Sequence, residues 1–451
     1  MFDIGIIGAG PAGYVAAIRA AQKGLTVVLF EKEHIGGTCL NKGCIPTKTI
    51  LHSCSVYKEL QNLSKLGLNA ENISFDFETI QTRQKTVSEK IRKSLTGLIK
   101  GYGITIVEEE ALIENKNIIK TTSSEYEVKN IIIATGSQPN KIKFTGSYSD
   151  DFVLTSDDVL NMQQLPSSIV IVGSGAIGIE WARIFSTLGV KVTVVEMMEK
   201  LLPPADIDIS DRLVRLFKKS RIDFYTSTLI EKIEGNTVFF NNGQQTETEK
   251  VLLGAGRIPV LSFGKLSDKL KIEKYIDVDC NFKTNIDNIY AIGDVNGLSM
   301  LAHSASRQAE DVIEYILNGK KNTFSRNLVP SVIYGTPEIA FIGKTEQQLQ
   351  AENIQYKKSF FPVSALGKSY ADDKIEGFVK ILADEKGKIL GTHIISEEAS
   401  AMIEQIAIAM TNNISADNLK EVIYAHPTYS EAILESILGL DNIAIHIPQK
   451  N

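Results

Sequence analysis

One sequence pattern occurs twice in this chain with the same spacing, and it constrains the fold more than any other feature. The first copy is an apolar run, Ile4–Ile7, followed by Gly8-x-Gly10-x-x-Gly13, a helical stretch to Gly24, and a second apolar run that ends at Glu31. The second copy is Ile169–Val172 followed by Gly173-x-Gly175-x-x-Gly178, a helical stretch to Gly189, and an apolar run that ends at Glu196. Such self-similarity indicates two structural units of the same kind.

Each copy has the order strand, glycine-rich turn, helix, strand and acidic residue that a dinucleotide-binding site requires. The first glycine permits the tight turn, the second lets the backbone approach a pyrophosphate, and the third lets the helix pack on the strand. The helix N-terminus offers N–H groups and the positive end of a dipole to the phosphates. Two ordinary tight turns are the alternative, which the matched spacing disfavours. The sequence therefore predicts two Rossmann-like dinucleotide-binding domains.

The acidic residue that ends each copy would accept hydrogen bonds from ribose hydroxyls. A carboxylate at Glu196 favours the free 2′-hydroxyl of NAD and repels the 2′-phosphate of NADP. The next two residues, Met197 and Met198, are not basic, and Lys200 is the nearest cation. We therefore expect NAD rather than NADP at the second site.

A second repeated element follows each copy. The apolar runs that begin at Ile131 and Val251 end in small residues, Ala134-Thr135-Gly136 and Gly254-Ala255-Gly256-Arg257. Small residues at the carboxyl end of a strand let the backbone lie against a ligand, although packing alone would also explain them.

Two cysteines, Cys39 and Cys44, lie five residues apart in a chain that has only four. Pro46 fits the first turn of a helix, which would place Cys44 at the helix N-terminus and lower the pKa of its thiol. Metal binding is the rival interpretation, but no second cysteine or histidine pair has ligand spacing. We expect Cys54 and Cys280 to be ordinary core thiols.

A redox dithiol between two dinucleotide fingerprints predicts an electron relay. One dinucleotide would be a flavin, because a flavin exchanges electrons with both a dithiol and a nicotinamide. The residues therefore predict a flavin dinucleotide and NAD+/NADH as cofactors, with no metal.

At this point the residues resemble a known family. The segment Gly36-Gly-Thr-Cys-Leu-Asn-Lys-Gly-Cys-Ile-Pro-Thr-Lys48 is similar to the redox-active segment of the pyridine nucleotide–disulfide oxidoreductases. Further matches are Ile292-Gly-Asp294, Met300-Leu-Ala-His303, Tyr334-Gly-Thr-Pro-Glu338, Gly391-Thr-His-Ile-Ile395 and His426-Pro-Thr-Tyr-Ser-Glu431, and the likeness runs from residue 3 to about residue 440. Lys42, between the cysteines, departs from the family pattern, in which an apolar residue is usual.

The resemblance implies that the flavin is tightly bound FAD, and it implies roles for individual residues. The implied FAD site comprises Gly8, Gly10, Gly13, Glu31, Thr38, Lys48, Ala111, Thr135, Gly136, Asp294 and Ala302, with Glu180 paired to Lys48. The implied NAD site comprises Gly173, Gly175, Gly178, Glu196, Ile230, Ala255, Gly256 and Arg257. Cys39, Cys44, His426 and Glu431 are implied to be catalytic.

The segment around His426 has two interpretations. Thr428-x-x-Glu431 matches a capping box that opens a helix, and His426 would then be only a turn residue before Pro427. The resemblance instead implies an acid/base dyad, in which Glu431 orients His426. In the family this dyad reaches the dithiol of the other subunit, which implies a homodimer.

The resemblance is strongest to members that oxidise protein-bound dihydrolipoamide with NAD+. It implies a lipoyl-bearing partner, either an acyltransferase or the carrier protein of the glycine cleavage system. Alternatives are a related flavin enzyme that reduces another small disulfide, and a structural subunit of such a complex. An extra cysteine pair near the C-terminus, as in mercuric ion and large thioredoxin reductases, is absent from Ile437–Asn451.

Composition and length agree with such an enzyme. A net charge of −6 argues against nucleic acid and anionic membranes as partners, and no apolar run is long enough to span a bilayer. With few cysteines and no signal peptide, we expect a cytoplasmic protein. The predicted fold is α/β, with an FAD-binding domain at 1–145 and 263–320 and an NAD-binding domain at 146–262. Residues 321–451 would form an α+β domain, because Gly377–Ala383 and Ile389–Ile395 alternate like antiparallel strands around a hairpin turn. The resemblance implies that this is the dimerisation domain.

Overall fold

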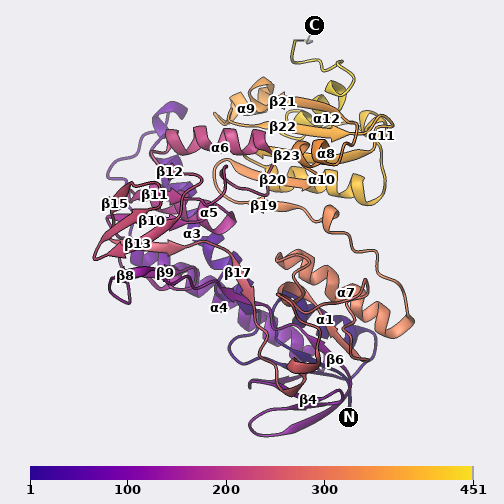
Figure 1. Ribbon diagram of the computed structural model, residues 1–451. Coiled ribbons are helices and arrows are strands. Elements are labelled where there is room, and N and C mark those ends of the chain that lie inside the picture. Colours follow the sequence, from indigo (N-terminus) through magenta and orange to yellow (C-terminus); the bar gives the residue numbers. More distant parts are fainter. Residues whose placement is uncertain (449–451) are drawn as a thin grey trace.

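The computed structural model describes residues 1–448. It contains two units built around parallel strands, the first and second parallel units, and a separate antiparallel sheet (Figure 1). The predicted α/β fold is confirmed. The chain begins in the first parallel unit, and its antiparallel sheet lies at the opposite end of the molecule (Figure 1). Residues 449–451 of the predicted interface domain lie outside the described residues.

The first fingerprint lies in a seven-stranded sheet of order β3-β2-β1-β6-β5-β4, with β18 also paired to β6. Strands β1, β2, β3, β6 and β18 are parallel, and β4-β5-β6 form an antiparallel meander. The strands are β1 (Phe2–Ile7), β2 (Val27–Phe30), β3 (Thr105–Val107), β4 (Leu112–Asn115), β5 (Ile118–Lys120), β6 (Glu125–Ile133) and β18 (Ile289–Ala291). Helices α1 (Pro11–Gln22) and α7 (Ala302–Asn318) pack together beside this sheet and share its apolar core.

The second fingerprint lies in a five-stranded parallel sheet of order β12-β11-β10-β16-β9. A four-stranded sheet, β15-β14-β13-β8, packs against it through Val170, Val195, Val251, Ile233 and Phe240. The strands are β8 (Thr145–Ser147), β9 (Val153–Thr155), β10 (Ser168–Val172), β11 (Lys191–Val195), β12 (Asp223–Tyr225), β13 (Ile230–Glu234), β14 (Thr237–Phe240), β15 (Gln245–Glu247) and β16 (Lys250–Leu253). Helices α5 (Ala176–Thr187) and α6 (Ile207–Lys219) belong to this unit.

The two parallel units are joined by a two-stranded antiparallel ribbon, β7 (Ser137–Pro139) with β17 (Arg257–Pro259). The chain leaves the first unit through β7 and returns through β17, and it then supplies β18 to the first sheet. We propose this ribbon as the boundary between the predicted FAD and NAD domains. The long helices α3 (Cys44–Leu60) and α4 (Phe77–Gly101) pack on each other, and α3 also contacts α5.

The C-terminal unit is a five-stranded antiparallel sheet of order β19-β20-β23-β22-β21. The predicted hairpin is confirmed as β22 paired with β23. Neither strand shows the expected alternation, because both are buried along nearly their whole length in the centre of the sheet. The elements are β19 (Ser331–Ile333), β20 (Glu338–Gly343), α8 (Glu346–Ala351), β21 (Lys357–Pro362), α9 (Gly367–Ala371), β22 (Phe378–Ala383), β23 (Ile389–Ser396), α10 (Ala399–Thr411), α11 (Ala416–Lys420) and α12 (Glu431–Gly439).

Apolar contacts link this C-terminal sheet to the second parallel unit. Ile333, Ile339, Phe378 and Ile395 of the antiparallel sheet belong to the same buried cluster as Trp181 and other residues of that unit. Among residues 1–448, no helix combines the length and apolar character needed to cross a bilayer.

Candidate active site

The first fingerprint forms a turn between β1 and α1 in which packing requires two of the three glycines. Gly8 has φ +99°, and a Cβ there would lie 2.4 Å from the Ala134 carbonyl oxygen. A Cβ at Gly13 would lie 1.8 Å from the Gly8 oxygen. A Cβ at Gly10 would meet only Gly37 Cα, at 3.8 Å, which is an ordinary contact. Packing therefore does not explain Gly10, whereas the approach of a ligand to its backbone does.

The second fingerprint repeats this geometry between β10 and α5. Gly173 has φ +95°, and a Cβ at Gly178 would lie 1.9 Å from the Gly173 oxygen. A Cβ at Gly175 meets no atom of residues 1–448 within 4 Å. No side chain of the described chain caps α1 or α5, so the first N–H groups of both helices are available to phosphate. These features fit the pyrophosphates of two dinucleotides.

The acidic residues of the two copies are held in the same way. Glu31 accepts hydrogen bonds from the N–H groups of Ala9 and Glu33, both at 2.9 Å. Glu196 accepts from the N–H groups of Ser174, at 2.8 Å, and Met198, at 2.9 Å. Because each carboxylate is fixed beside its glycine turn, each is placed to accept a ribose hydroxyl.

The cysteine pair lies where a short helix meets the start of the long helix α3, beside the first fingerprint. Cys39 is in α2 (Gly37–Asn41) and Cys44 is the first residue of α3, so the expected position of Cys44 at a helix N-terminus is confirmed. The start of α2 touches the glycine turn, because a Cβ at Gly37 would lie 2.6 Å from Gly10 Cα. All four cysteines are free thiols in the structure.

The two thiols are electrostatically unequal. A hydrogen bond from the Cys39 thiol, together with the nearby Lys48 ammonium, lowers the pKa of Cys44 to about 7 against the opposing effect of burial. The same hydrogen bond and burial raise the pKa of Cys39. Cys44 is therefore the thiolate of the reduced pair and Cys39 the protonated thiol.

Lys48 connects the dithiol to the second parallel unit. Its ammonium bonds both carboxylate oxygens of Glu180 on α5, each at 2.8 Å, so the pairing expected from the sequence is present. The ammonium also lies 4.8 Å from the ring centroid of Tyr334, whose N–H donates to Glu180. Although burial opposes it, the Glu180 carboxylate raises the pKa of Lys48, which keeps the cation charged beside the cysteines.

Asp294 belongs to a buried polar network at the junction of the two parallel units. Ser137 donates to Asp294 at 2.5 Å and accepts from Arg257 at 2.8 Å. Arg257 also donates to the Ser137 carbonyl and to Thr38 Oγ1, at 2.7 and 3.3 Å. Burial raises the pKa of the Asp294 carboxyl. The Arg257 side chain is thus hydrogen-bonded to residues on the predicted FAD side of the junction. The predicted contact of this segment with NAD would then be made by neighbouring backbone atoms.

The predicted acid/base pair is formed within the C-terminal unit. His426 Nδ1 lies 2.8 Å from Glu431 Oε1, and the other Glu431 oxygen accepts the Thr428 N–H at 2.9 Å. Although burial opposes it, these two hydrogen bonds lower the pKa of Glu431. The His426 side chain is 74% exposed. Within residues 1–448, no hydrogen bond joins it to the cysteine pair.

The capping-box interpretation of this segment is wrong in one respect. Thr428 does not cap the helix, because its hydroxyl donates to the Ala425 carbonyl and α12 begins only at Glu431. The carboxylate of Glu431 is instead shared between the Thr428 backbone and the imidazole of His426, so one residue fixes the turn and orients the histidine.

The remaining predicted residues lie at the edges of the two sites. Ala111 is buried just before β4, Thr135 donates to the Val260 carbonyl at 2.7 Å, and Ala302 opens α7. Gly136 follows Thr135 with φ +69°. Ala255 and Gly256 follow β16, and Ile230 opens β13, two residues after Thr228, whose N–H donates to the Glu196 carbonyl.

Two serines were missed by the sequence analysis, although each is adjacent to a motif glycine. Ser137 follows Gly136 and bonds both Asp294 and Arg257, while Ser174 lies between two fingerprint glycines and donates twice to Glu196. One expectation for the cysteines is wrong: Cys54 is buried, but Cys280 is exposed. Lys42, between the cysteines in sequence, forms an ion pair with Glu33.

Comparisons with known proteins show the family of the chain. Residues 2–309 match the family model described as pyridine nucleotide-disulphide oxidoreductase, and residues 329–437 match the dimerisation domain of that family. The chain is similar to a dihydrolipoyl dehydrogenase of Bacillus subtilis, at 36% identity over 99% of both chains. It is also similar to a dihydrolipoyl dehydrogenase of Chlamydia pneumoniae, at 35% identity over 100% of this chain and 99% of the other. The crystal structure of LpdA from Mycobacterium tuberculosis superposes with a TM-score of 0.90 at 26% identity, covering 98% of this chain and all of the other.

Proposed function

The chain belongs to the pyridine nucleotide–disulphide oxidoreductases, and from this membership we propose that it is a dihydrolipoyl dehydrogenase. It would oxidise dihydrolipoyl groups with NAD+, through bound FAD and the Cys39–Cys44 pair. One observation carries the proposal: the segment that carries the dithiol packs against the first dinucleotide turn through Gly37, and the pKa of Cys44 is lowered to about 7 while that of Cys39 is raised.

The residues of the first fingerprint fit FAD. The turn at Gly10, where packing does not require a glycine, the uncapped N-terminus of α1 and the fixed carboxylate of Glu31 suit its pyrophosphate and adenosine ribose. Asp294 and the backbone of Ala302 would hold the rest of the molecule at the junction with the second unit. When bound, FAD supplies two-electron exchange between a dithiol and a nicotinamide. Gly173, Gly175, Gly178 and Glu196 would bind NAD+ in the same manner.

His426 begins the reaction as a general base. With its Nδ1 bonded to Glu431, the imidazole has Nε2 free to take a proton from one thiol of the substrate. The resulting thiolate attacks Cys39 Sγ of the oxidised pair, the Cys39–Cys44 bond breaks, and Cys44 leaves as a thiolate. The lowered pKa of Cys44 suits it to this role as leaving group.

The second substrate thiol completes the exchange. It attacks the substrate sulfur of the mixed disulfide, closes the lipoyl ring and expels Cys39, which takes the proton that this second thiol loses and becomes a thiol. The proton of the first thiol stays on His426 until it is released to solvent. The raised pKa of Cys39 favours this protonated product. The chain then holds the reduced pair, with Lys48 beside the Cys44 thiolate. Two electrons and one proton remain to be passed on before the disulfide re-forms.

The protein is a homodimer, since its C-terminal segment is the dimerisation domain of the family. We propose that His426 acts on the dithiol of the other protomer, which is supported by its high exposure and by the lack of a hydrogen bond to its own cysteine pair among residues 1–448. The proposed partner is a lipoyl-bearing acyltransferase or glycine cleavage carrier protein. Four free cysteines are typical of a reducing compartment, and we propose the cytoplasm.

Anaerobic titration of the purified protein with dihydrolipoamide tests the proposal. We expect bound flavin, a long-wavelength absorption band from the Cys44 thiolate beside it, and loss of that band on addition of NAD+. NADH-dependent reduction of lipoamide should exceed that of glutathione disulfide. A protein that holds no flavin, or that prefers another disulfide, would contradict the assignment.

A further inference from the structure

A buried lysine joins the C-terminal sheet to the second dinucleotide unit. Lys380 lies on β22, and its side chain is 2% exposed. Its ammonium bonds Asp206 at 2.8 Å, Asp208 at 2.6 Å and Glu346 at 2.6 Å. Asp206 is the N-cap of α6, and Figure 1 shows α6 beside the strands of the antiparallel sheet. The lysine therefore holds the start of an NAD-unit helix against a different part of the molecule.

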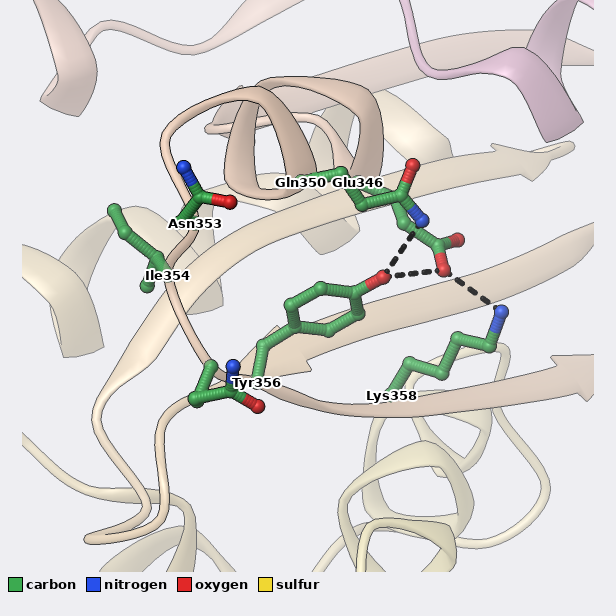
Figure 2. A pocket seen from close by; sticks show the side chains of 7 residues that line it. Glu346, Gln350, Asn353, Ile354, Tyr356 and Lys358 are labelled. Carbon is green, nitrogen blue, oxygen red and sulfur yellow. Dashed lines mark hydrogen bonds and ion pairs between the residues drawn. The ribbon is translucent and has the colours of Figure 1, made fainter.

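The groups around Lys380 form one polar cluster, in which Lys380, Asp206 and Glu346 are buried and Asp208 is partly exposed. Glu346 also accepts hydrogen bonds from Tyr356 and Lys358, at 2.8 and 2.7 Å (Figure 2). These residues face a surface cavity of roughly 570 Å³ between α8 and β21. His393 lies next to Asp206 in this cluster. It is fully buried, it stacks on Phe341, and its Nε2 is 3.9 Å from the Asp206 carboxylate. Burial lowers the pKa of His393 to about 4, so it is neutral here.

Stability alone is a weak reason for such a cluster. Burying charges costs desolvation energy, and apolar residues of similar volume often stabilise a protein as well or better. A buried ionic cluster does fix geometry, because each charge must keep its partners. Lys380 is therefore better explained by the geometry that it fixes.

A continuous path leads from Lys380 to the predicted ribose carboxylate. Asp206 ends a loop that begins directly after Glu196, and Leu201, Leu202 and Ala205 of this loop are buried. The Leu202 N–H donates to Ser174 Oγ at 3.0 Å. The same hydroxyl donates to the Glu196 carboxylate at 2.7 Å, and the Ser174 N–H donates to that carboxylate at 2.8 Å. Glu196 is thus fixed by Ser174, which is itself bonded to a loop whose far end is held by Lys380.

We propose that Lys380 is a positioning residue for NAD+ binding. Through Asp206 it sets the loop between Glu196 and α6, and through that loop the orientation of Ser174 and Glu196. This inference rests on the proposed function, in that it takes Glu196 as the ribose-binding carboxylate. It makes the geometry of the nucleotide site depend on the sheet of the dimerisation domain.

The test compares nucleotide binding with the dithiol reaction in Lys380→Met. We expect the Kd for NAD+, measured on the holoenzyme, and the KM for NAD+ to rise about tenfold, the equivalent of losing one good hydrogen bond. Flavin content and the KM for dihydrolipoamide should stay within about twofold, because neither site touches the cluster. An unchanged affinity for NAD+ in a folded Lys380→Met enzyme overturns the proposal.

A second variant covers the case in which Lys380→Met does not fold. Lys380→Met leaves Asp206 and Glu346 without their buried cation, whereas Lys380→Met with Asp206→Asn removes one charge of each sign. The double variant should recover thermal stability but keep the raised Kd for NAD+. Recovery of both would mean that Lys380 serves stability alone and would overturn the inference.

Two controls separate this inference from the proposed function. Lys358→Met removes another ammonium from Glu346 but does not touch Asp206, so NAD+ affinity should not change. Glu196→Gln should weaken NAD+ binding directly. If Glu196→Gln has no effect, the nucleotide site itself is wrongly placed, whereas an effect of Glu196→Gln without one of Lys380→Met rejects only the positioning role.

Discussion

The two dinucleotide fingerprints have nearly the same backbone but different surroundings. Gly8 and Gly173 have φ of +99° and +95°, and each third glycine packs just as closely on the oxygen of the first. The chain covers the first turn, because the Gly36 N–H donates to the Ala9 carbonyl and Gly37 lies against Gly10. Among the described residues no atom lies within 4 Å of a Cβ placed at Gly175, and Met197 and Met198, next to Glu196, are 64% and 50% exposed.

This difference separates a resident cofactor from an exchangeable substrate. The fingerprint provides the same phosphate and ribose contacts in both places, so it cannot by itself decide how long a ligand stays. At the first site the segment that carries the dithiol folds over the turn, and a bound dinucleotide would be enclosed beside Cys44. At the second site the turn is open, which suits a nucleotide that must enter and leave in every cycle.

The largest expected effect comes from the covering segment of the first site. Cys44→Ser should lower the rate of dihydrolipoamide oxidation by roughly 10³-fold or more, because no disulfide can form. Flavin content and NADH oxidation by an artificial one-electron acceptor should remain, since these need only the two dinucleotide sites. A steady-state assay of both activities on one preparation measures the split.

Cys280→Ser is the matched control for this variant, because Cys280 is exposed and lies outside the predicted site. It should leave both activities unchanged. If Cys44→Ser also kept its dihydrolipoamide activity, the chain would act as a structural subunit or by another route. The segment that covers the first site would then not carry the dithiol of the reaction.

The next effect concerns the base that serves the covered site. His426→Gln should lower dihydrolipoamide turnover by roughly 10²- to 10⁴-fold, the usual contribution of a general base. The NADH reaction with an artificial acceptor should not change, because the open site does not use this histidine. Stopped-flow measurement of the two half-reactions would separate the effects.

The chain offers a close control for His426. His446 Nδ1 lies 2.8 Å from Glu435, one helical turn after Glu431 on α12, so both histidines make the same pairing on the same helix. His446→Gln should change turnover by less than about twofold. Equal losses in the two variants would show that the pairing stabilises α12 and that neither histidine is the base.

A smaller effect should follow from filling the two middle glycines. Gly10→Ala and Gly175→Ala fit the protein without a clash, and both backbones lie at φ near −70°. Gly10→Ala should weaken retention of FAD, and Gly175→Ala should raise the KM for NAD+ about tenfold while FAD stays bound. Flavin reconstitution and NAD+ titration give the two numbers. A Gly175→Ala enzyme with unchanged KM would contradict the proposed NAD site.

The sequence predicted the parts of this arrangement that depend on local backbone geometry. The matched glycine spacing gave both turns, and Pro46 correctly placed Cys44 at the start of a helix. The resemblance led to the pairs Lys48–Glu180 and His426–Glu431, which are hydrogen-bonded in the structure. Whether these residues act as predicted in binding and catalysis stays a prediction.

The sequence did not reveal what depends on contacts between distant segments. The covering of Gly10 by Gly37 and the contact of Ser137 with both Asp294 and Arg257 arise only when separate parts of the chain meet. The same holds for Lys380, which looks like a strand lysine in the sequence but is buried beneath α6. Cys280 was misjudged because a lone cysteine carries no signal of its exposure.

The smallest expected effect tests the contact between the two regions. Lys48 lies on α3 beside the covered site, and its partner Glu180 lies on the helix of the open fingerprint. The pKa of Cys44 is lowered to about 7, so the thiolate of the reduced enzyme dominates above pH 7 and is protonated as the pH falls through that value. The long-wavelength absorption of the reduced enzyme, followed against pH, reports this titration.

Lys48→Met should move the midpoint of this titration upward by about one pH unit, because the cation favours the thiolate. Glu180→Gln should move it downward, because the carboxylate raises the pKa of Cys44. Shifts of the same sign in both variants would mean that the pair acts only by holding α3 against α5, and that the open fingerprint has no electrostatic effect on the dithiol.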